Sequence, residues 1–409
     1  MVSILILLAA RGAAIPFRGD WYHGGVKLPR FLAAAFLAVA IALVAAGCAG
    51  VANPEGWASP AVSEPSAYIV LKKDKLYAVD LQDGSLGATR WVFPDKNRHP
   101  DQDKLDLRAI YSTPVVEGDT IYVADYEAGV FAISADDGSV RWRVRGDDIS
   151  GNVGHDLGVS GDFLAFGTTD GHVYVIKKQD GSPAPGWDTK GRTFDDGIWA
   201  TPVIAGDRVF VATMGGALHA LSLSDGAELW SQPFEVDGAI AALTLLDEER
   251  LFVPSLNKYV YIVATSDGSV LGEFKASDWV WTEPAVKGER VYFGDFSGNV
   301  YALDITNGIE PVWEFAAGQK VKSGPAIVEN VRDLGDVLVV ADNDPVVYFL
   351  NAETGERLNA VPIEDAGRVR AGLTAFEGRA YVVTTGGKVF AAEPERLAVV
   401  GPIAVGGAQ

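Results

Sequence analysis

The chain has 409 residues, of which 48% are hydrophobic and 22% charged, and its formal net charge is −20. This composition is typical of a folded globular protein and excludes a wholly disordered one. The acidic balance argues against nucleic acid and anionic membrane surfaces as partners, because phosphate binding depends on clustered Lys and Arg. A single cysteine excludes an intrachain disulfide, a CxxC redox pair and a cysteine-rich zinc site.

Residues 1–47 are predicted to be a secretory signal of the lipoprotein type. Basic residues precede an apolar run from Phe31 to Val44, and three small residues directly precede Cys48. This order of basic, apolar and small residues is typical of a signal. The residues before Cys48 resemble a bacterial lipobox, which implies that Cys48 carries a lipid and begins the mature chain. An uncleaved anchor or a plain signal is the alternative.

Residues 48–56 are expected to be a short tether. The protein would then lie outside the cytoplasm, anchored to the cell membrane, or to the outer membrane of a host that has one. The lipid would be its only contact with the membrane.

One pattern recurs eight times from Trp57 onward, with a mean period of about 43 residues. Its clearest copies begin at Tyr111, Trp199 and Trp281. Each copy contains four short segments in which β-branched and aromatic residues alternate with others, and Gly-containing turns separate them. Residues 57–409 are therefore predicted to form an all-β, eight-bladed β-propeller of four-stranded antiparallel blades. Either Leu397–Ile403 or a segment near Val51 could supply the last outer strand.

The repeat resembles the pyrroloquinoline-quinone (PQQ) type, with a core of the form Val-Tyr-Val, then Gly-x-Val-Tyr-Ala-Leu-Asp, then Trp. The match covers nearly all of the chain after the signal. In that family the Trp at the end of the fourth strand docks between neighbouring blades. The matching residues, which are expected to pack rather than to catalyse, are Trp91, Trp142, Trp187, Trp230 and Trp313.

Two kinds of protein carry this repeat. PQQ-dependent dehydrogenases oxidise alcohols or sugars with PQQ and calcium, whereas the lipoproteins of the BamB family are non-catalytic scaffolds of outer-membrane β-barrel assembly. The chain is closer in plan to the second kind, and it lacks the adjacent cysteines found in many dehydrogenases. The resemblance implies a scaffold or adaptor that binds envelope proteins and needs no cofactor. The alternatives are a PQQ- and calcium-dependent dehydrogenase and a polymer- or sugar-binding surface protein.

Aligning the eight copies predicts one candidate binding site at the mouth of the central channel. Residues two apart on a strand share a face, so aromatic and basic residues before the first strands would lie on one arc. The candidate residues are Trp57, Tyr111, Trp279, Trp281, Lys320, Lys322, Arg368 and Arg370. Aromatic rings and paired cations favour an anionic ligand that is planar or bears a carboxylate. Alternatively, the cations balance nearby acids such as Glu364 and Asp365.

No standard catalytic motif is present, and neither catalytic nor metal-binding residues are assigned. The pair His155-Asp156 could act as a general base or a metal ligand, but no third partner is evident from the sequence. Asp101, Asp103 and Asp106 only faintly resemble a calcium loop, and a solvated acidic loop is the favoured interpretation.

Overall fold

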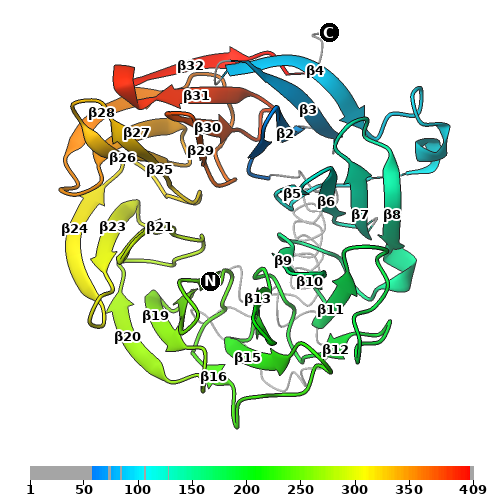
Figure 1. Cartoon of the computed structure of the whole chain (residues 1–409). Helices are drawn as coiled ribbons and strands as arrows, with labels where there is room; N and C mark the ends of the chain where they lie inside the picture. Colours follow the sequence, from blue (N-terminus) through cyan, green and yellow to red (C-terminus); the bar gives the residue numbers. More distant parts are fainter. Residues whose placement is uncertain (1–57, 72–74, 83–84, 106, 128, 406–409) are drawn as a thin grey trace, which may run out of the picture. The chain divides into compact units, whose positions relative to one another are not determined.

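The computed structural model describes residues 58–405, except 72–74, 83–84, 106 and 128. Within this part, eight four-stranded antiparallel sheets are arranged around a ring (Figure 1). The predicted all-β, eight-bladed propeller is therefore confirmed. The predicted signal, the tether, Cys48 and Trp57 lie outside the described residues.

Each blade consists of four strands that follow one another in the sequence. Blades one to four contain β1 (Ala61–Ser63), β2 (Ser66–Leu71), β3 (Lys75–Gln82), β4 (Ser85–Phe93); β5 (Val115–Glu117), β6 (Thr120–Asp125), β7 (Gly129–Ser134), β8 (Val140–Arg145); β9 (Gly158–Ser160), β10 (Phe163–Gly167), β11 (His172–Lys177), β12 (Arg192–Thr193); β13 (Val203–Ala205), β14 (Arg208–Ala212), β15 (Ala217–Ser222) and β16 (Phe234–Glu235).

Blades five to eight have the same order. They contain β17 (Thr244–Leu245), β18 (Arg250–Pro254), β19 (Tyr259–Ala264), β20 (Val270–Lys275); β21 (Ala285–Lys287), β22 (Arg290–Gly294), β23 (Asn299–Asp304), β24 (Glu310–Ala316); β25 (Ala326–Val331), β26 (Gly335–Ala341), β27 (Val346–Asn351), β28 (Arg357–Pro362); β29 (Thr374–Phe376), β30 (Arg379–Val383), β31 (Val389–Glu393) and β32 (Ala398–Ile403).

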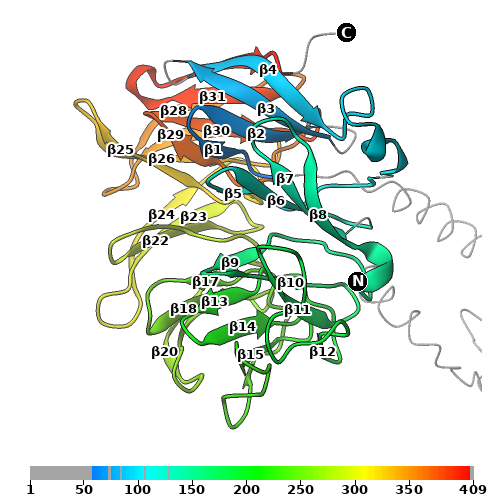
Figure 2. The same ribbon diagram turned by 45° about the vertical axis from the view of Figure 1, so that its right-hand side comes forward.

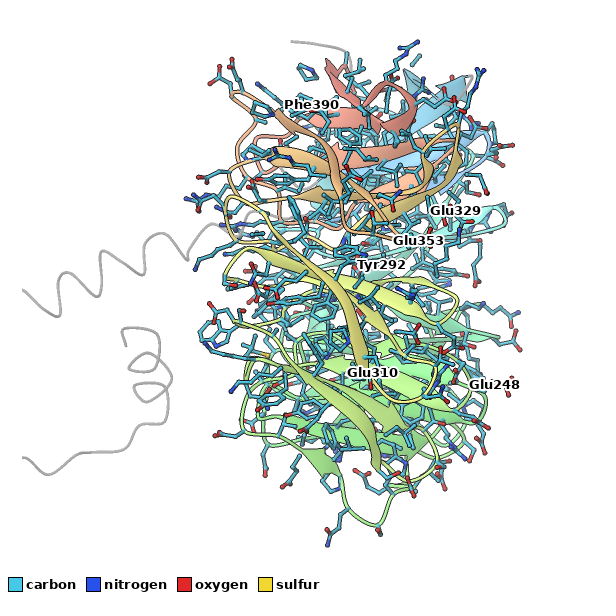
Figure 3. The ribbon with its side chains drawn as sticks, turned by 90° about the vertical axis from the view of Figure 1, so that its left-hand side faces the viewer. Glu248, Tyr292, Glu310, Glu329, Glu353 and Phe390 are labelled. Carbon is cyan, nitrogen blue, oxygen red and sulfur yellow. The ribbon has the colours of Figure 1, made fainter. Side chains whose placement is uncertain are left out.

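Burial along the strands follows from stacking the blades face to face. Every residue of β6 and β7 is buried, because both faces of a middle strand pack against neighbouring sheets. The outer strand β8 instead alternates between partly buried and exposed residues. Figure 3 shows the ring edge-on, with buried Tyr292 between the sheets and exposed Glu248 at the surface.

The predicted docking tryptophans each connect one blade to the next. Their indole N–H groups donate hydrogen bonds of 2.8–3.1 Å to backbone carbonyls of the following blade. The pairs are Trp91 with Ala135, Trp142 with Lys178, Trp187 with Leu223, Trp230 with Thr265, and Trp313 with Ala352. Each bond gives the indole N–H a partner at the junction, where most of the ring is removed from water.

Two junctions without a tryptophan are bridged differently. On blade five Gly272 occupies the corresponding position, and Ile309 of the next blade lies directly against it. On blade seven the side-chain amide of Asn359 donates a 2.7 Å hydrogen bond to the carbonyl oxygen of Leu397. Both sites therefore make a direct contact with the following blade.

The carboxyl-terminal strand completes the ring. β32 pairs with β31, and Val400 lies opposite Ala391. Leu397–Ile403 therefore supplies the outer strand of blade eight, which is one of the two closures predicted from the sequence. Blade eight then packs against blade one, where Tyr381 and Ile69 share a core cluster. The hydroxyl of Thr374 also donates a 2.6 Å hydrogen bond to the carbonyl oxygen of Pro60. Figure 2 shows the two blades side by side.

The helices in the described residues are short 3-10 turns: η1 (Pro100–Lys104), η2 (Gly146–Asp148) and η3 (Pro394–Arg396). Within this part of the chain, none has the length and apolarity needed to cross a membrane. The insert that precedes blade two includes η1, and Gln102 donates a 2.8 Å hydrogen bond to the carbonyl oxygen of Gly138. This bond attaches the insert to the propeller. Asp106, one of the three acids that faintly resemble a calcium loop, lies outside the described residues.

Candidate functional site

Equivalent backbone hydrogen bonds position three of the predicted residues. In blades six, seven and eight, the segment before the innermost strand lies against the turn between the second and third strands. Phe296 N–H donates to the carbonyl oxygen of Trp279 at 3.0 Å, and Asn343 N–H to that of Lys320 at 2.8 Å. The N–H of Thr385 donates to Arg368 in the same way, at 2.9 Å. The repeat therefore places residues 279, 320 and 368 at corresponding points of adjacent blades.

A buried carboxylate fixes the turn of blade six. Asp295 is 0% exposed and accepts hydrogen bonds from the backbone N–H groups of Asp278, Ser297 and Asn299, each at 2.9 Å. The hydroxyl of Tyr301 donates to the same carboxylate at 3.0 Å. These bonds hold the turn and the segment that leads to Trp279 in one arrangement.

Phe296, in this turn, is the centre of a cluster that the sequence alignment did not identify. Its ring centroid lies 6.0 Å from that of Trp279 and 6.3 Å from that of Trp281. The ammonium groups of Lys320 and Lys322 lie 5.5 and 4.9 Å from its ring, within the range of cation–π attraction. We call these five residues the channel-mouth cluster. The sequence contained one sign of Phe296, an aromatic residue in a turn. Its position lies outside the first-strand segments that were aligned, so the alignment did not include it.

A cavity of about 220 Å³ lies next to the channel-mouth cluster and shares two of its residues. Trp281 and Lys322 line it together with the predicted Tyr111 and Arg370. Burial lowers the pKa of Lys322, and the nearby charges of Arg370, Lys320 and Arg368 lower it further. The four predicted cations therefore act on one another, as a single concentration of positive charge.

Glu364 and Asp365, the acids proposed as an alternative balance, do not pair with Lys320, Lys322 or Arg368 in the part of the chain that the structure describes. Within the described residues, Lys320, Lys322 and Arg368 form no ion pair, and Glu364 and Asp365 are exposed. Trp279 is 43% exposed, so the cluster has an open aromatic face as well as its charge. This combination can attract and stack on an anionic group that enters from solvent.

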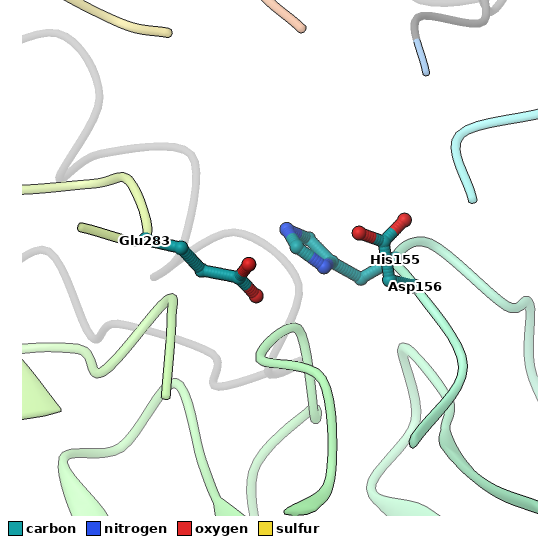
Figure 4. Close-up of side chains that lie close together, drawn as sticks. All are labelled: His155, Asp156 and Glu283. Carbon is teal, nitrogen blue, oxygen red and sulfur yellow. The ribbon is translucent and has the colours of Figure 1, made fainter. Parts of the chain in front are cut away.

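A second group of side chains occupies the same cavity. His155 and Asp156 of blade three and Glu283 of blade six each offer one ligand atom, and these atoms all lie within 4.8 Å of one another (Figure 4). We call these three residues the acid–histidine cluster. No third partner for the His155-Asp156 pair was evident from the sequence. The structure shows that Glu283 lies beside them. It lies three repeats further along the chain, so no local motif could have identified it.

Neighbouring threonines orient this cluster. The Nδ1 atom of His155 lies 2.9 Å from Oγ1 of Thr201, and the backbone N–H of Thr113 donates a 2.5 Å hydrogen bond to Oδ1 of Asp156. The pKa of Glu283 is raised to about 8, mainly by burial and also by the charge of Asp156, while a hydrogen bond from Thr201 opposes the shift. Burial lowers the pKa of His155, which favours a neutral imidazole.

Three comparisons relate this architecture to known proteins. A family model described as "Outer membrane protein assembly factor BamB" matches residues 52–184, 184–308 and 238–407. The protein of that name from Moranella endobia (strain PCIT) is 23% identical over 284 residues, which cover 67% of this chain and 70% of the relative. Its counterpart from Legionella pneumophila (strain Paris) is 22% identical over 350 residues, which cover 73% and 86%.

A solved structure supports the fold. The crystal structure of BamB from Moraxella catarrhalis aligns with a TM-score of 0.61 at 19% identity, covering 82% of this chain and 92% of that one. At this level of identity the likeness concerns the fold.

Proposed function

Because this chain belongs to the family of the outer membrane protein assembly factor BamB, we propose that it is a non-catalytic scaffold of the cell envelope. In this role the propeller binds envelope proteins during their assembly. The names of its relatives support this role and do not favour the dehydrogenase or the polymer-binding alternative. One fold can serve many activities, so the residues of the site decide the function.

The proposed location is outside the cytoplasm, with a lipid on Cys48 as the contact with the membrane. The lipobox-like residues before Cys48 and the BamB relatives support this location. Replacing Cys48 with Ser is expected to move the protein from the membrane fraction to the soluble fraction. Retention of the Cys48→Ser variant in the membrane fraction would contradict lipid anchoring at this residue.

The observation that carries the scaffold proposal is the concentration of positive charge at the channel mouth, where Lys320, Lys322 and Arg368 form no ion pair within the described residues. Lys320 and Lys322 lie over Phe296, and the charges of Arg368 and Arg370 act on Lys322. A protein of net charge −20 repels acidic partners over most of its surface, so such a patch selects where they can bind.

The chemistry of the patch fits an acidic segment of a partner protein that also carries aromatic residues. Carboxylates of the segment would pair with the Lys and Arg groups, and its aromatic side chains would stack on Trp279 and Trp281. Electrostatic attraction would speed the encounter and make it sensitive to salt.

The test joins a binding assay to an assembly assay. The probe is a fluorescein-labelled synthetic peptide of alternating Glu and Tyr, compared with a peptide in which Gln replaces Glu. The wild-type chain is expected to bind only the Glu peptide, and more weakly as salt rises. It is also expected to restore folded outer-membrane barrel proteins in a strain that lacks its own BamB.

The variant for both assays is Lys322→Glu with Arg370→Glu, which is expected to lose peptide binding and assembly. The matched control is Arg332→Glu with Arg357→Glu, which makes the same charge change at exposed sites of blade seven. Failure of the wild-type chain to restore assembly overturns the scaffold role. Unchanged binding and assembly in Lys322→Glu/Arg370→Glu overturns the assignment of the site.

A further inference from the structure

The acid–histidine cluster departs from the repeat at one defined position. The residue two before the first strand is Thr113 in blade two and Thr201 in blade four, ahead of β5 and β13. Blades three and six carry Asp156 and Glu283 at that position, ahead of β9 and β21. Thr occupies this point in blades two and four, so the repeat itself does not require a carboxylate there.

From this placement we propose that His155, Asp156 and Glu283 bind one divalent transition-metal cation, of which Zn²⁺ is the representative. This site is independent of the proposed scaffold function. One imidazole nitrogen and two carboxylates form a ligand set that suits Zn²⁺, whereas Ca²⁺ and Mg²⁺ prefer oxygen ligands alone.

The three candidate ligand atoms lie near one another but farther apart than the ligands of a bound metal. Four ligands at about 2.0–2.2 Å from a tetrahedral metal lie about 3.3–3.6 Å from one another. The three ligand atoms here already lie within 4.8 Å of one another, although they come from two blades. In Figure 4 the side chain of Glu283 extends toward the ring of His155 from the opposite side. Metal binding would therefore require the three ligand atoms to move closer together, and rotation of the two carboxylates is the movement that we infer.

The neighbouring threonines leave at least one ligand atom of His155 and of Asp156 available to a metal. Thr201 contacts Nδ1 of His155, which directs Nε2 toward a metal, and Thr113 N–H occupies only Oδ1 of Asp156. Such outer partners are the usual means of fixing a ligand's tautomer and orientation. Within the described part of the chain, neither Asp156 nor Glu283 forms an ion pair.

Lys322 and Arg370 line the same cavity and reduce its attraction for cations. A bound dication would offset this repulsion through direct bonds to two carboxylates, and it would join blades three and six inside the channel. Three protein ligands would leave one coordination position open to the cavity, as in metal sites that bind a water or an anion.

The experiment titrates ZnSO₄ into the purified full chain, in detergent, after removal of metal with a chelator. Calorimetry is expected to show one saturable site per chain, and the melting temperature is expected to rise with Zn²⁺ but not with equal Ca²⁺ or Mg²⁺. Co²⁺ should give the visible absorption of a low-coordinate site. Glu283→Gln and His155→Ala are each expected to weaken Zn²⁺ binding at least 100-fold.

The matched control is His219→Ala with Glu228→Gln, because that His and carboxylate pair lies 2.8 Å apart but outside the cavity. It should leave Zn²⁺ binding unchanged. Absence of saturable Zn²⁺ binding to the wild-type chain overturns the proposal whether or not a variant folds. Equal binding by Glu283→Gln and the wild type, or tighter binding of Ca²⁺ than of Zn²⁺, also overturns it. Thr201→Val, a positioning variant, is expected to weaken Zn²⁺ about 10-fold.

Discussion

The carboxylates of Asp156 and Glu283 meet inside the propeller cavity although they belong to blades three and six, with ligand atoms within 4.8 Å of each other. Two adjacent carboxylates repel each other when both are ionised, so the pair retains a proton or attracts a cation. The imidazole of His155 completes the group and, because burial lowers its pKa, does not readily supply the positive charge itself.

This relationship predicts how stability depends on pH in metal-free protein. Burial raises the pKa of Glu283 from 4.5 to about 8, so between these values the folded chain holds a proton that the unfolded chain has lost. Stability therefore falls as pH rises through this window. Glu283→Gln removes the effect, and with a chelator present its melting temperature should exceed that of the wild type increasingly from pH 5 to pH 8.

The difference between Glu283→Gln and the wild type should be small at pH 4, where the carboxyl is protonated in both states. Glu248→Gln, at an exposed position, is the control and should not show the trend. A constant difference across the whole pH range would contradict the predicted titration of Glu283.

The docking tryptophans should dominate stability at the blade junctions. Trp230 is 6% exposed, and its ring lies 2.9 Å from the point where a Cβ on Gly268 would stand. Gly268 also has a φ of 79°, a conformation that favours glycine. Trp230→Ala is expected to cost about 3–5 kcal/mol, measured by chemical denaturation.

Two companion variants separate the contributions at this junction. Trp230→Phe keeps an aromatic ring but loses the hydrogen bond to Thr265, so a smaller loss is expected. Leu229→Ala, at the adjacent residue with 46% exposure, should change stability by less than about 0.5 kcal/mol. If Trp230→Ala were no more harmful than Leu229→Ala, the tryptophan would not stabilise the junction.

Phe296 should contribute to binding rather than to folding. Its ring is partly exposed and lies under two ammonium groups, and each such contact is worth about 0.5–1 kcal/mol. Phe296→Leu removes the ring that positions both ammonium groups before the peptide arrives, so it is expected to weaken binding of the Glu-Tyr peptide severalfold with little change in melting temperature.

The control for Phe296 is Tyr259→Leu, which removes an aromatic ring from beneath Lys275 at 5.5 Å on blade five. It should not affect peptide binding. Equal losses in the two variants would indicate a general effect of aromatic residues rather than a site at the channel mouth.

The outer strand of blade eight should be essential for ring closure. Ending the chain after Leu397 removes β32, leaves β31 without its outer partner and exposes the core against which Val399 packs. We expect a large fall in melting temperature and rapid proteolysis of blade eight. Val400→Ser, at a position with 46% exposure on the same strand, should be nearly neutral. A truncated chain as stable as the wild type would contradict this account of closure.

The repeat made the propeller predictable because its signals are local. Alternating apolar residues, Gly-containing turns and a Trp at a fixed place each reflect the conformation of a few neighbouring residues. The same periodicity brought Tyr111, Trp281, Lys322 and Arg370 to one cavity, since equivalent positions of a repeat occupy equivalent places in a ring. Phe296 was missed because it lies in a turn, outside the aligned segments.

Ring closure and the acid–histidine cluster depended on contacts between distant blades. From the sequence alone, Leu397–Ile403 and the segment near Val51 were equally able to complete the last sheet, because strand pairing has no local signature that names its partner. Composition, repeat length and residue type therefore determined that the chain folds as a propeller with aromatic and cationic side chains on one arc. Only the closed ring decided that Glu283 meets His155 and Asp156, because side chains from blades three and six converge when all eight blades surround one axis.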